Sequence, residues 1–405
     1  MPSPPTSRPC WVEIRTRALE DNYRSLQSLA GPGVECLAIV KADAYGHSLA
    51  LCAPAAVRAG ARWLGVTSVE EGVAARAACP DVRIVVMGGI FPGQAAAVFE
   101  NSLTPVVWDP WQLDELENFA KQSGYPRWSM PVHLEIDTGM SRQGVSLYDL
   151  PAVLSRFTST SVLAPEAVMT HLYGSDEANG HATARQLAVL EESLKRIAAS
   201  LAPEVFGTVW LSVGSSAALL ASDAEQINAL AGRVGLNPML RLGLALYGVA
   251  PRFEPEFPAG QTPAALLSAR AHLQPVLSFK TRVASVRTVP AGAEIGYNGT
   301  FVATEPMRLA LIAAGYADGL DRRLGNRFSL LVRGQRAPLA GRVSMDQSVL
   351  DVTEIPGVVS GDEVVILGEQ GGESITAYDH ADATGTIPWE VFTRIASRVQ
   401  RVEAG

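Results

Sequence analysis

The stretch Val40-Lys41-Ala42-Asp43-Ala44-Tyr45-Gly46-His47 places a single lysine directly after the apolar run Cys36–Val40. The run predicts a buried strand, and Lys41 stands where that strand ends. An arbitrary lysine after a strand is usually a surface charge. Burial, however, destabilises an ammonium group, so a lysine at such a strand end can carry a nucleophilic amine near neutral pH. We therefore take Lys41 as a candidate Schiff-base lysine.

Short apolar strands alternate with helical segments from about Thr16 to Gly248. Eight such strands over this length indicate a (β/α)8 barrel. A doubly wound open sheet is the competing topology, but no GxGxxG opens the first helix. The predicted strands are Glu35–Val40, Trp63–Val66, Arg83–Met87, Leu103–Val107, Val132–Ile136, Ala164–Met169, Val209–Val213 and Met239–Leu242.

The sequence changes character after Gly248, where four prolines fall between Pro251 and Pro263. The β-rich runs that follow are separated by Gly- and Pro-containing turns, which is typical of an antiparallel β domain. We expect a barrel domain over 16–250 and a C-terminal β domain over 251–405, to which strand 11–15 also belongs. The last helix is expected at Trp389–Val399. The predicted strands of the second domain are Val276–Val289, Leu309–Ala314, Phe328–Val332, Ser348–Val352 and Glu363–Leu367.

Composition excludes several classes of function. The 405 residues suggest about two domains, and a net charge of −8 without a basic run gives no support to nucleic-acid binding. No window approaches the ~18 apolar residues of a membrane span, so we expect no membrane association and a cytoplasmic protein. Neither the four cysteines nor any His or carboxylate cluster has metal-ligand spacing, so no metal site is predicted.

Other polar residues follow the later strands of the predicted barrel. Loops after strands seven and eight form the usual phosphate site of such barrels, and Gly243 would let a phosphate approach the backbone closely. Taken alone, each residue has an ordinary structural role as a solvated charge or a packing partner. The segments are Glu135–Arg142, Met169-Thr170-His171, Ser215-Ser216-Ala217 and Arg241–Gly248, with Glu294–Thr300, Gly315–Gly319, Gly341–Gln347 and Gly385–Glu390 in the second domain.

These segments, in this order between Trp11 and Arg401, closely resemble the alanine racemase family. The octapeptide around Lys41 resembles the pyridoxal phosphate (PLP) lysine motif of that family. The resemblance implies a PLP-dependent amino-acid racemase that interconverts L-alanine and D-alanine by two-base proton exchange at Cα. It also implies a homodimer with shared active sites, and D-alanine as a product for peptidoglycan.

The resemblance assigns a role to individual residues. Lys41 and Tyr297 are the two catalytic bases, and Tyr297 reaches the active site of the partner subunit. Arg142, the backbone N–H of Met345 and Tyr316 belong to the substrate side. The residues implied in cofactor binding are Lys41, Tyr45, His171, Ser216, Arg241, Gly243, Leu244 and Trp389.

Arg241 is implied to face the pyridine nitrogen of the cofactor. An arginine stays protonated and offers only donors, so it cannot act as an acid at that nitrogen. The cofactor then withdraws electrons weakly, which favours simple proton exchange over transamination and argues against a decarboxylase of related fold. Racemisation also needs a proton-carrying group on each face of Cα, and Lys41 serves one face only.

Three positions depart from the family pattern. Glu135 stands where many members have a lysine, often carbamylated, and we hypothesise that its carboxylate pairs with Arg142. Ser215 replaces an asparagine, and Trp389 replaces a tyrosine, which predicts a narrowed pocket or a lost phosphate contact. These changes leave open a racemase of another small amino acid such as serine, or a broader one. A non-enzymatic PLP-binding protein is less compatible with the second domain and Tyr297.

Overall fold

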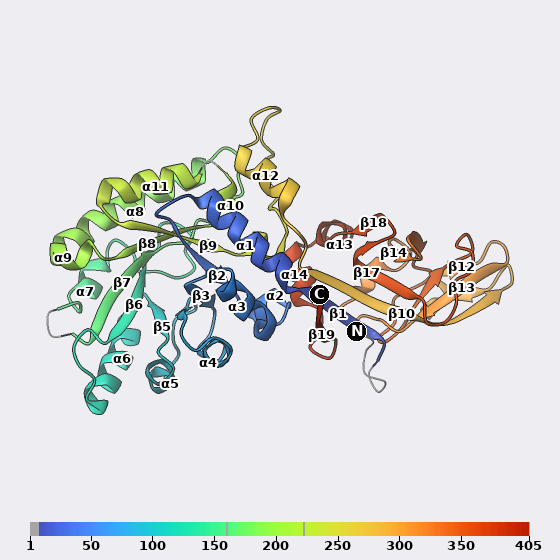
Figure 1. Ribbon diagram of the computed structural model, residues 1–405, viewed down its shortest axis with the longest axis horizontal. Coiled ribbons are helices and arrows are strands. Elements are labelled where there is room, and N and C mark those ends of the chain that lie inside the picture. Colours follow the sequence, from blue (N-terminus) through green and yellow to red (C-terminus); the bar gives the residue numbers. More distant parts are fainter. Residues whose placement is uncertain (1–7, 159–160, 222, 405) are drawn as a thin grey trace. The chain divides into compact units, whose positions relative to one another are not determined.

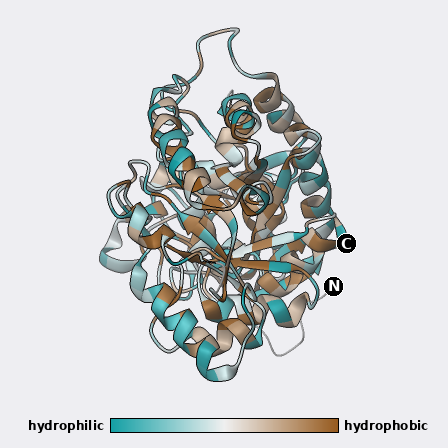
Figure 2. Ribbon diagram, turned by 90° about the vertical axis from the view of Figure 1, so that its left-hand side faces the viewer, coloured by the Kyte–Doolittle hydropathy of each residue, from teal (hydrophilic) through white to brown (hydrophobic). Residues whose placement is uncertain are grey.

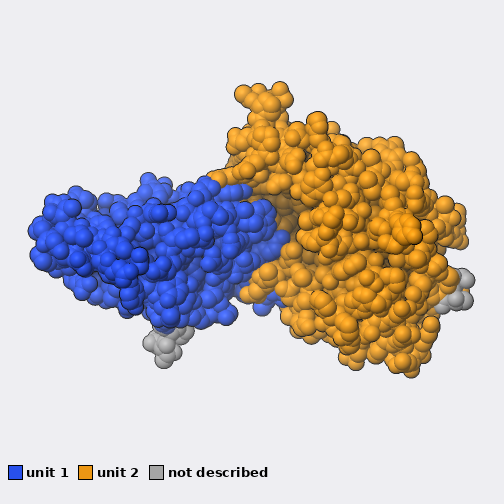
Figure 3. All heavy atoms as spheres, turned by 180° about the vertical axis from the view of Figure 1, so that it is seen from behind, with its two compact units in different colours: residues 1–16, 45–51, 275–405 blue, residues 17–44, 52–274 orange. Residues whose placement is uncertain are grey.

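The computed structural model describes residues 8–158, 161–221 and 223–404. Contacts divide the chain into two compact units, shown blue and orange in Figure 3. Unit 1 contains the N-terminal residues up to Thr16, the short segment Tyr45–Leu51, and the chain from Pro275 onward, while unit 2 contains Arg17–Ala44 and Cys52–Gln274. The domain limits 16–250 and 251–405 stay a prediction from the sequence.

Eight parallel strands close into a barrel in unit 2, with β9 pairing back to β2 (Figure 1). Every strand overlaps one expected from the sequence, and closure excludes the doubly wound alternative, so the predicted fold class is confirmed. Around the barrel the strands are β2 (Glu35–Ile39), β3 (Trp63–Val66), β4 (Arg83–Val86), β5 (Thr104–Val107), β6 (Met130–Glu135), β7 (Leu163–Met169), β8 (Trp210–Ser215) and β9 (Asn237–Leu242).

Most residues of the barrel strands are buried, as expected from their mostly apolar sequences. All five residues of β2 and all four of β3 are buried. Strands covered by helices on one side and by the barrel interior on the other have no solvent face, which explains why they do not alternate polar and apolar residues. In Figure 2 the strands at the centre of the view are mostly brown, while the helices around them carry more teal.

Helices connect the barrel strands, and their ends follow local capping signals. At α6 the Asp109 side chain accepts a hydrogen bond from the Trp111 amide, Pro110 opens the helix, and Gly124 closes it in the left-handed conformation. The helices of this part are α1 (Thr16–Ala30), α2 (Lys41–Tyr45), α3 (Leu49–Arg58), α4 (Val69–Ala78), α5 (Ala95–Glu100), α6 (Pro110–Ser123), α7 (Leu150–Leu154), α8 (His181–Ser200), α9 (Pro203–Phe206), α10 (Ser216–Leu220), α11 (Asp223–Val234), η1 (Leu244–Tyr247) and α12 (Ala264–His272).

Unit 1 is built on a nine-stranded, mainly antiparallel sheet. β1 (Cys10–Arg15) pairs with β10 (Leu277–Val289) antiparallel and with β19 (Gln400–Ala404) parallel, so the first strand of the chain lies between β10 and the last strand. The strands are β1 (Cys10–Arg15), β10 (Leu277–Val289), β13 (Met307–Ile312), β14 (Ser329–Val332), β15 (Gln335–Pro338), β16 (Ser348–Asp351), β17 (Glu363–Gln370), β18 (Glu373–Ile375) and β19 (Gln400–Ala404). Around it lie the β11 (Glu294–Ile295) and β12 (Phe301–Val302) ribbon, η2 (Tyr297–Gly299), η3 (Arg322–Leu324), α13 (Ala377–Thr384) and α14 (Pro388–Thr393).

The last helix is shorter than the sequence predicts. α14 ends at Thr393, whereas the apolar pattern indicated a helix up to Val399. The Ala396 amide donates to the backbone oxygen of Asp318 at 3.2 Å, so it does not continue the helical ladder. A tertiary hydrogen bond therefore overrides the local helical pattern.

Among the described residues, no helix is long and apolar enough to cross a membrane. Within the same residues, no group of three His, Cys, Asp or Glu side chains is arranged to hold a metal ion. Cys10, Cys36, Cys52 and Cys79 are all buried free thiols.

Candidate active site

Lys41 directly follows β2 at the carboxyl end of the barrel strands. The next four residues, Ala42–Tyr45, all have φ between 52° and 56°, so the chain makes a left-handed helical turn. The Ala44 amide closes this turn onto the Val40 carbonyl at 2.9 Å. Left-handed helical geometry costs roughly 1–2 kcal/mol for each non-glycine residue. The backbone beside Lys41 is therefore strained, and its contacts must hold it.

The electrostatic surroundings of Lys41 favour a neutral amine. Burial lowers the pKa of Lys41 below its ordinary value, and the nearby positive charges of Arg142 and Arg241 lower it further, while Glu71 raises it. A lower pKa increases the fraction of unprotonated amine near neutral pH. This is the property on which the sequence-based prediction for Lys41 rested.

Arg241 of β9 is buried and makes four hydrogen bonds at the same edge of the barrel. One terminal nitrogen donates to the Ser212 carbonyl at 2.7 Å and to its hydroxyl at 3.1 Å. The other donates to the Thr170 carbonyl at 2.8 Å and meets Nδ1 of His171 at 3.1 Å. Burial lowers the pKa of Arg241 to about 10, which still leaves the guanidinium protonated at neutral pH.

The contact with Arg241 defines the chemical state of His171. Because a guanidinium has only donors, Nδ1 of His171 must accept, and its ring proton is then on Nε2. Burial, then the charges of Arg241 and Arg142, lower the pKa of His171 to about 3. His171 is therefore a neutral ring at this edge, which suits the cofactor-binding role predicted for it.

The loops after β8 and β9 are joined through Ser216. The Gly243 amide donates to the Ser216 hydroxyl at 2.9 Å, and Leu244 begins η1 immediately afterwards. The three predicted phosphate-side residues thus lie together at the carboxyl end of the barrel. Ser215, which replaces an asparagine of the family pattern, has its hydroxyl 3.3 Å from that of Ser175 in the loop after β7.

The predicted ion pair between Glu135 and Arg142 is wrong. Glu135 is buried, and it accepts a short hydrogen bond from the Gln143 side chain, which also donates to the Met87 carbonyl. Burial raises the pKa of Glu135, while the Gln143 bond and the charges of Arg241 and Arg142 lower it in part. Arg142 thus acts on Glu135 as a nearby charge and not as a hydrogen-bond partner.

The turn after β6 explains why Gln143 takes this position. The Asp137 carboxylate accepts hydrogen bonds from the amides of Gly139 and Ser141, which tightens the turn. The Val145 amide then returns to the Glu135 carbonyl at 2.8 Å. This return brings Gln143, two residues before Val145, alongside the Glu135 side chain.

Tyr45 and Trp389 lie together in unit 1. Burial raises the pKa of the Tyr45 hydroxyl to about 12, and a hydrogen bond with the Trp389 side chain acts in the opposite direction. Since the indole N–H is the only polar atom of tryptophan and can only donate, Tyr45 is the acceptor in this bond. The nearby Gly46 has no room for a side chain, because an added Cβ would lie 2.5 Å from the Phe392 carbonyl.

Tyr297, Tyr316 and Met345 lie on neighbouring loops of unit 1 and are exposed by 66%, 42% and 53%. The Tyr316 amide donates to the Ser344 carbonyl at 3.0 Å, and the Ala317 amide donates to the Met345 carbonyl at 3.0 Å. Within the described residues the Met345 N–H has no acceptor, so it is available to a carboxylate.

Sequence reasoning missed Glu71, Gln143 and Ser175. Glu71 stands three residues after the helix-capping Ser68, a spacing that signals a helix start. No sequence signal shows that its side chain reaches the turn after Lys41. The partners of Glu135 and Ser215 likewise depend on loop paths that periodicity does not describe.

A closed parallel barrel with its polar side chains at the carboxyl ends of the strands, joined to a mainly antiparallel sheet, defines a barrel enzyme with an accessory β domain. A model of the alanine racemase N-terminal domain matches residues 14–251, and a model of the C-terminal domain matches residues 276–403. The chain belongs to the alanine racemase family. As a member, it is an isomerase that interconverts the two enantiomers of alanine.

Individual relatives agree over the full length. An alanine racemase from Halothermothrix orenii is 35% identical, with 98% of this chain and 97% of the relative covered. A crystal structure of alanine racemase from Streptomyces lavendulae is 33% identical, with a TM-score of 0.84 and coverage of 99% and 98%. One from Bartonella henselae with covalently bound pyridoxal phosphate is 27% identical, with a TM-score of 0.79 and coverage of 98% and 99%.

Proposed function

We propose that the chain racemises alanine with pyridoxal phosphate held at Lys41, using Lys41 and Tyr297 as the two bases. The single observation that carries this proposal is the meeting of Lys41, Arg142 and Arg241 at one barrel edge, where burial and both arginines favour a neutral lysine amine. The covalently bound cofactor of the Bartonella henselae relative supports the choice of group.

The residues present fit this cofactor. When bound, pyridoxal phosphate withdraws electrons from the amino acid and so acidifies its Cα–H. Arg241 would face the ring nitrogen as a pure donor, and neutral His171 would lie against the ring. The phosphate would be held by Ser216, Gly243 and Leu244. Tyr45 would also bind it, because Tyr45 accepts from Trp389 and its own hydroxyl proton can be donated to another group.

The proton transfers follow from the two bases. The deprotonated oxygen of Tyr297 takes the Cα proton of L-alanine and becomes a hydroxyl, while Lys41 in its ammonium form delivers a proton to the opposite face and becomes a neutral amine. D-alanine reverses the two roles. Arg142 and the Met345 N–H hold the substrate carboxylate, and Tyr316 limits the size of the side chain that enters.

We also propose that two copies of the chain share their active sites. Tyr297 is 66% exposed in the single chain, and Tyr316 and Met345 on neighbouring loops are exposed as well, which is expected of residues that act in a second copy. The same proposal includes a cytoplasmic enzyme whose D-alanine is used for peptidoglycan.

The test compares Tyr297→Phe (Y297F) with Tyr148→Phe, a control at a tyrosine that is 91% exposed. Loss of one acid/base group slows proton transfer by about 10²–10⁴-fold, so Y297F should bind pyridoxal phosphate normally but barely racemise. In D2O it should still exchange the Cα proton of D-alanine through Lys41 while L-alanine loses its exchange. Normal racemisation by Y297F would refute the two-base assignment. A panel of L-amino acids assayed for D-product then defines the substrate range.

A further inference from the structure

The side chain of Glu71 joins the ends of two neighbouring barrel strands. Its Oε1 accepts a hydrogen bond from the Ala42 amide at 2.7 Å, and its Oε2 accepts one from the Thr67 amide at 2.7 Å. Ala42 directly follows Lys41 after β2, and Thr67 directly follows β3. A single carboxylate therefore ties the backbone next to Lys41 to the adjacent strand.

The Glu71 contact acts on the strained part of the chain. Ala42 is the first residue of the left-handed turn, and none of the residues Ala42–Tyr45 is a glycine. Without contacts, an alanine or aspartate at these angles would relax to a more common conformation. A hydrogen bond to a carboxylate is short and strong, so Glu71 is well suited to hold the Ala42 amide in place.

The contact differs from ordinary helix capping. Ser68 caps α4 by accepting from the Glu71 amide, which places Glu71 at the third position of the helix. A glutamate at this position commonly turns back to the amide of its own cap residue. Here the side chain instead bonds the amide of the residue before the cap and the amide after Lys41. The hydrogen bond from the Ala42 amide to Glu71 is not needed to stabilise α4 alone.

The charged groups facing Lys41 give Glu71 a distinct electrostatic effect. Arg142 after β6 and Arg241 of β9 disfavour the ammonium form, His171 after β7 is neutral, and Glu71 of α4 favours the ammonium form. Glu71 is thus placed to oppose the two arginines and to limit how far they shift the lysine.

We propose that Glu71 is a positioning residue for Lys41, which fixes the left-handed turn through the Ala42 amide and balances the arginine charges on the lysine amine. This inference rests on the proposed role of Lys41, because it concerns how that amine is held and charged. It assigns Glu71 no direct contact with substrate.

The test measures two independent properties of the full-length chain without cofactor. The first is the pH midpoint of Lys41 labelling by trinitrobenzenesulfonate, read peptide by peptide, with the exposed Lys121 and Lys195 as internal references. The second is hydrogen exchange of the Ala42 and Thr67 amides. In Glu71→Gln (E71Q) and Glu71→Ala (E71A) the Lys41 midpoint should fall, and both amides should exchange at least tenfold faster.

The matched control is Glu70→Gln (E70Q), one residue away. The exposed Glu70 side chain interacts with Gln94 and with the capping Ser68. It bonds neither the Ala42 nor the Thr67 amide, so neither property should change. With pyridoxal phosphate restored, E71Q should lose about tenfold in kcat, which corresponds to ~1.4 kcal/mol of transition-state stabilisation. An unshifted midpoint in a folded E71Q protein would overturn the inference. If wild-type Lys41 is not protected from labelling by pyridoxal phosphate, the proposed function fails instead.

Discussion

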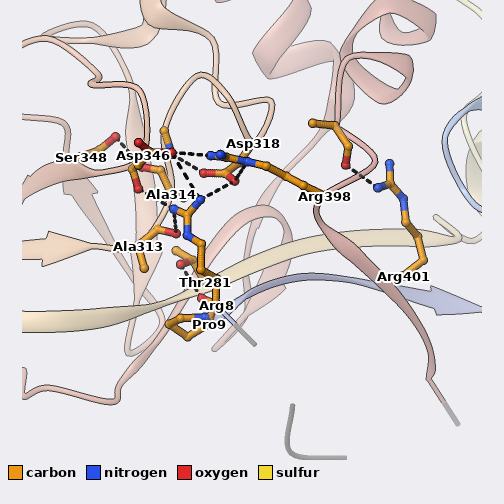
Figure 4. A network of polar contacts seen from close by, with 12 residues as sticks. Arg8, Pro9, Thr281, Ala313, Ala314, Asp318, Asp346, Ser348, Arg398 and Arg401 are labelled. Carbon is orange, nitrogen blue, oxygen red and sulfur yellow. Dashed lines mark hydrogen bonds and ion pairs between the residues drawn. The ribbon is translucent and has the colours of Figure 1, made fainter. Parts of the chain in front are cut away.

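Replacing Asp318 by asparagine (D318N) should destabilise unit 1 much more than the same change at Asp346 (D346N). The Asp318 side chain is only 2% exposed, and one of its oxygens accepts from Arg8 at 2.9 Å and from Arg398 at 2.8 Å. Its other oxygen accepts from the Gly315 amide at 2.9 Å. Figure 4 shows the carboxylate between the two guanidinium groups, with Asp346 beside them.

The magnitude follows from burial. Breaking a buried ion pair by removing one charge costs about 3–5 kcal/mol. Arg8 and Arg398 are 40% and 42% exposed, so they can regain water and still face Asp346, and we reduce the expected cost to ~2–3 kcal/mol. The asparagine side chain in D318N would also point its NH2 group at one or more of the three N–H donors, from Arg8, Arg398 and Gly315, which adds to the loss of stability. Asp346 is 53% exposed, so D346N should cost less than ~1 kcal/mol.

Hydrogen exchange of the β10 and β13 amides measures this cost in unit 1 alone, at one fixed protein concentration. Equal opening free energies in D318N and D346N, or a loss below ~1 kcal/mol in D318N, would refute the reasoning. The Asp318 side chain accepts from the Gly315 amide, and the Ala317 amide of the same loop donates to the Met345 carbonyl. Because this loop carries Tyr316, D318N should also raise the KM for alanine. An unchanged KM would separate the stability effect from the substrate site.

Two further predictions concern the barrel edge and the phosphate side. The folded pKa of His171 is about 3, below its ordinary 6.5, so between these values the unfolded chain binds a proton that the folded chain lacks, and stability rises with pH. His171→Asn should reduce that slope by up to ~1.4 kcal/mol per pH unit in urea unfolding, and an unchanged slope would contradict it. Trp389→Phe should weaken pyridoxal phosphate binding about three- to tenfold by removing one hydrogen bond, without affecting pyridoxal, which lacks the phosphate. An equal loss of affinity for pyridoxal phosphate and for pyridoxal would show that Trp389 does not act on the phosphate.

The fold could be predicted because its strands are encoded locally. Each of the eight barrel strands is a short and mostly apolar run, which is the pattern expected of a parallel strand covered on both faces. The helix at Trp389–Val399 was predicted too long because the bond from Ala396 to Asp318 joins residues 78 positions apart. Hydrophobic periodicity describes only the local sequence pattern, so it does not predict such a long-range contact.

The candidate site could be predicted only in part. Lys41, Arg241 and Ser216 stand next to strand ends, so their meeting follows from barrel closure. The partner of Glu135 does not, since it depends on the hydrogen bonds that Asp137 makes within the following turn. The path of the turn decides whether Arg142 or the next residue, Gln143, lies beside Glu135. Sequence spacing alone does not distinguish these two arrangements.

We expect that the tryptophan at position 389 serves the proposed phosphate site by a different route from the tyrosine of the family pattern. A tyrosine hydroxyl both donates and accepts, whereas an indole only donates. The Trp389 hydrogen bond therefore ends on the Tyr45 oxygen, and the Tyr45 proton must point elsewhere. Trp389 itself then has no donor left for a phosphate, and in the proposed site Tyr45 would be the donor. We therefore expect that the phosphate contact predicted to be lost at Trp389 is replaced by an indirect one through Tyr45.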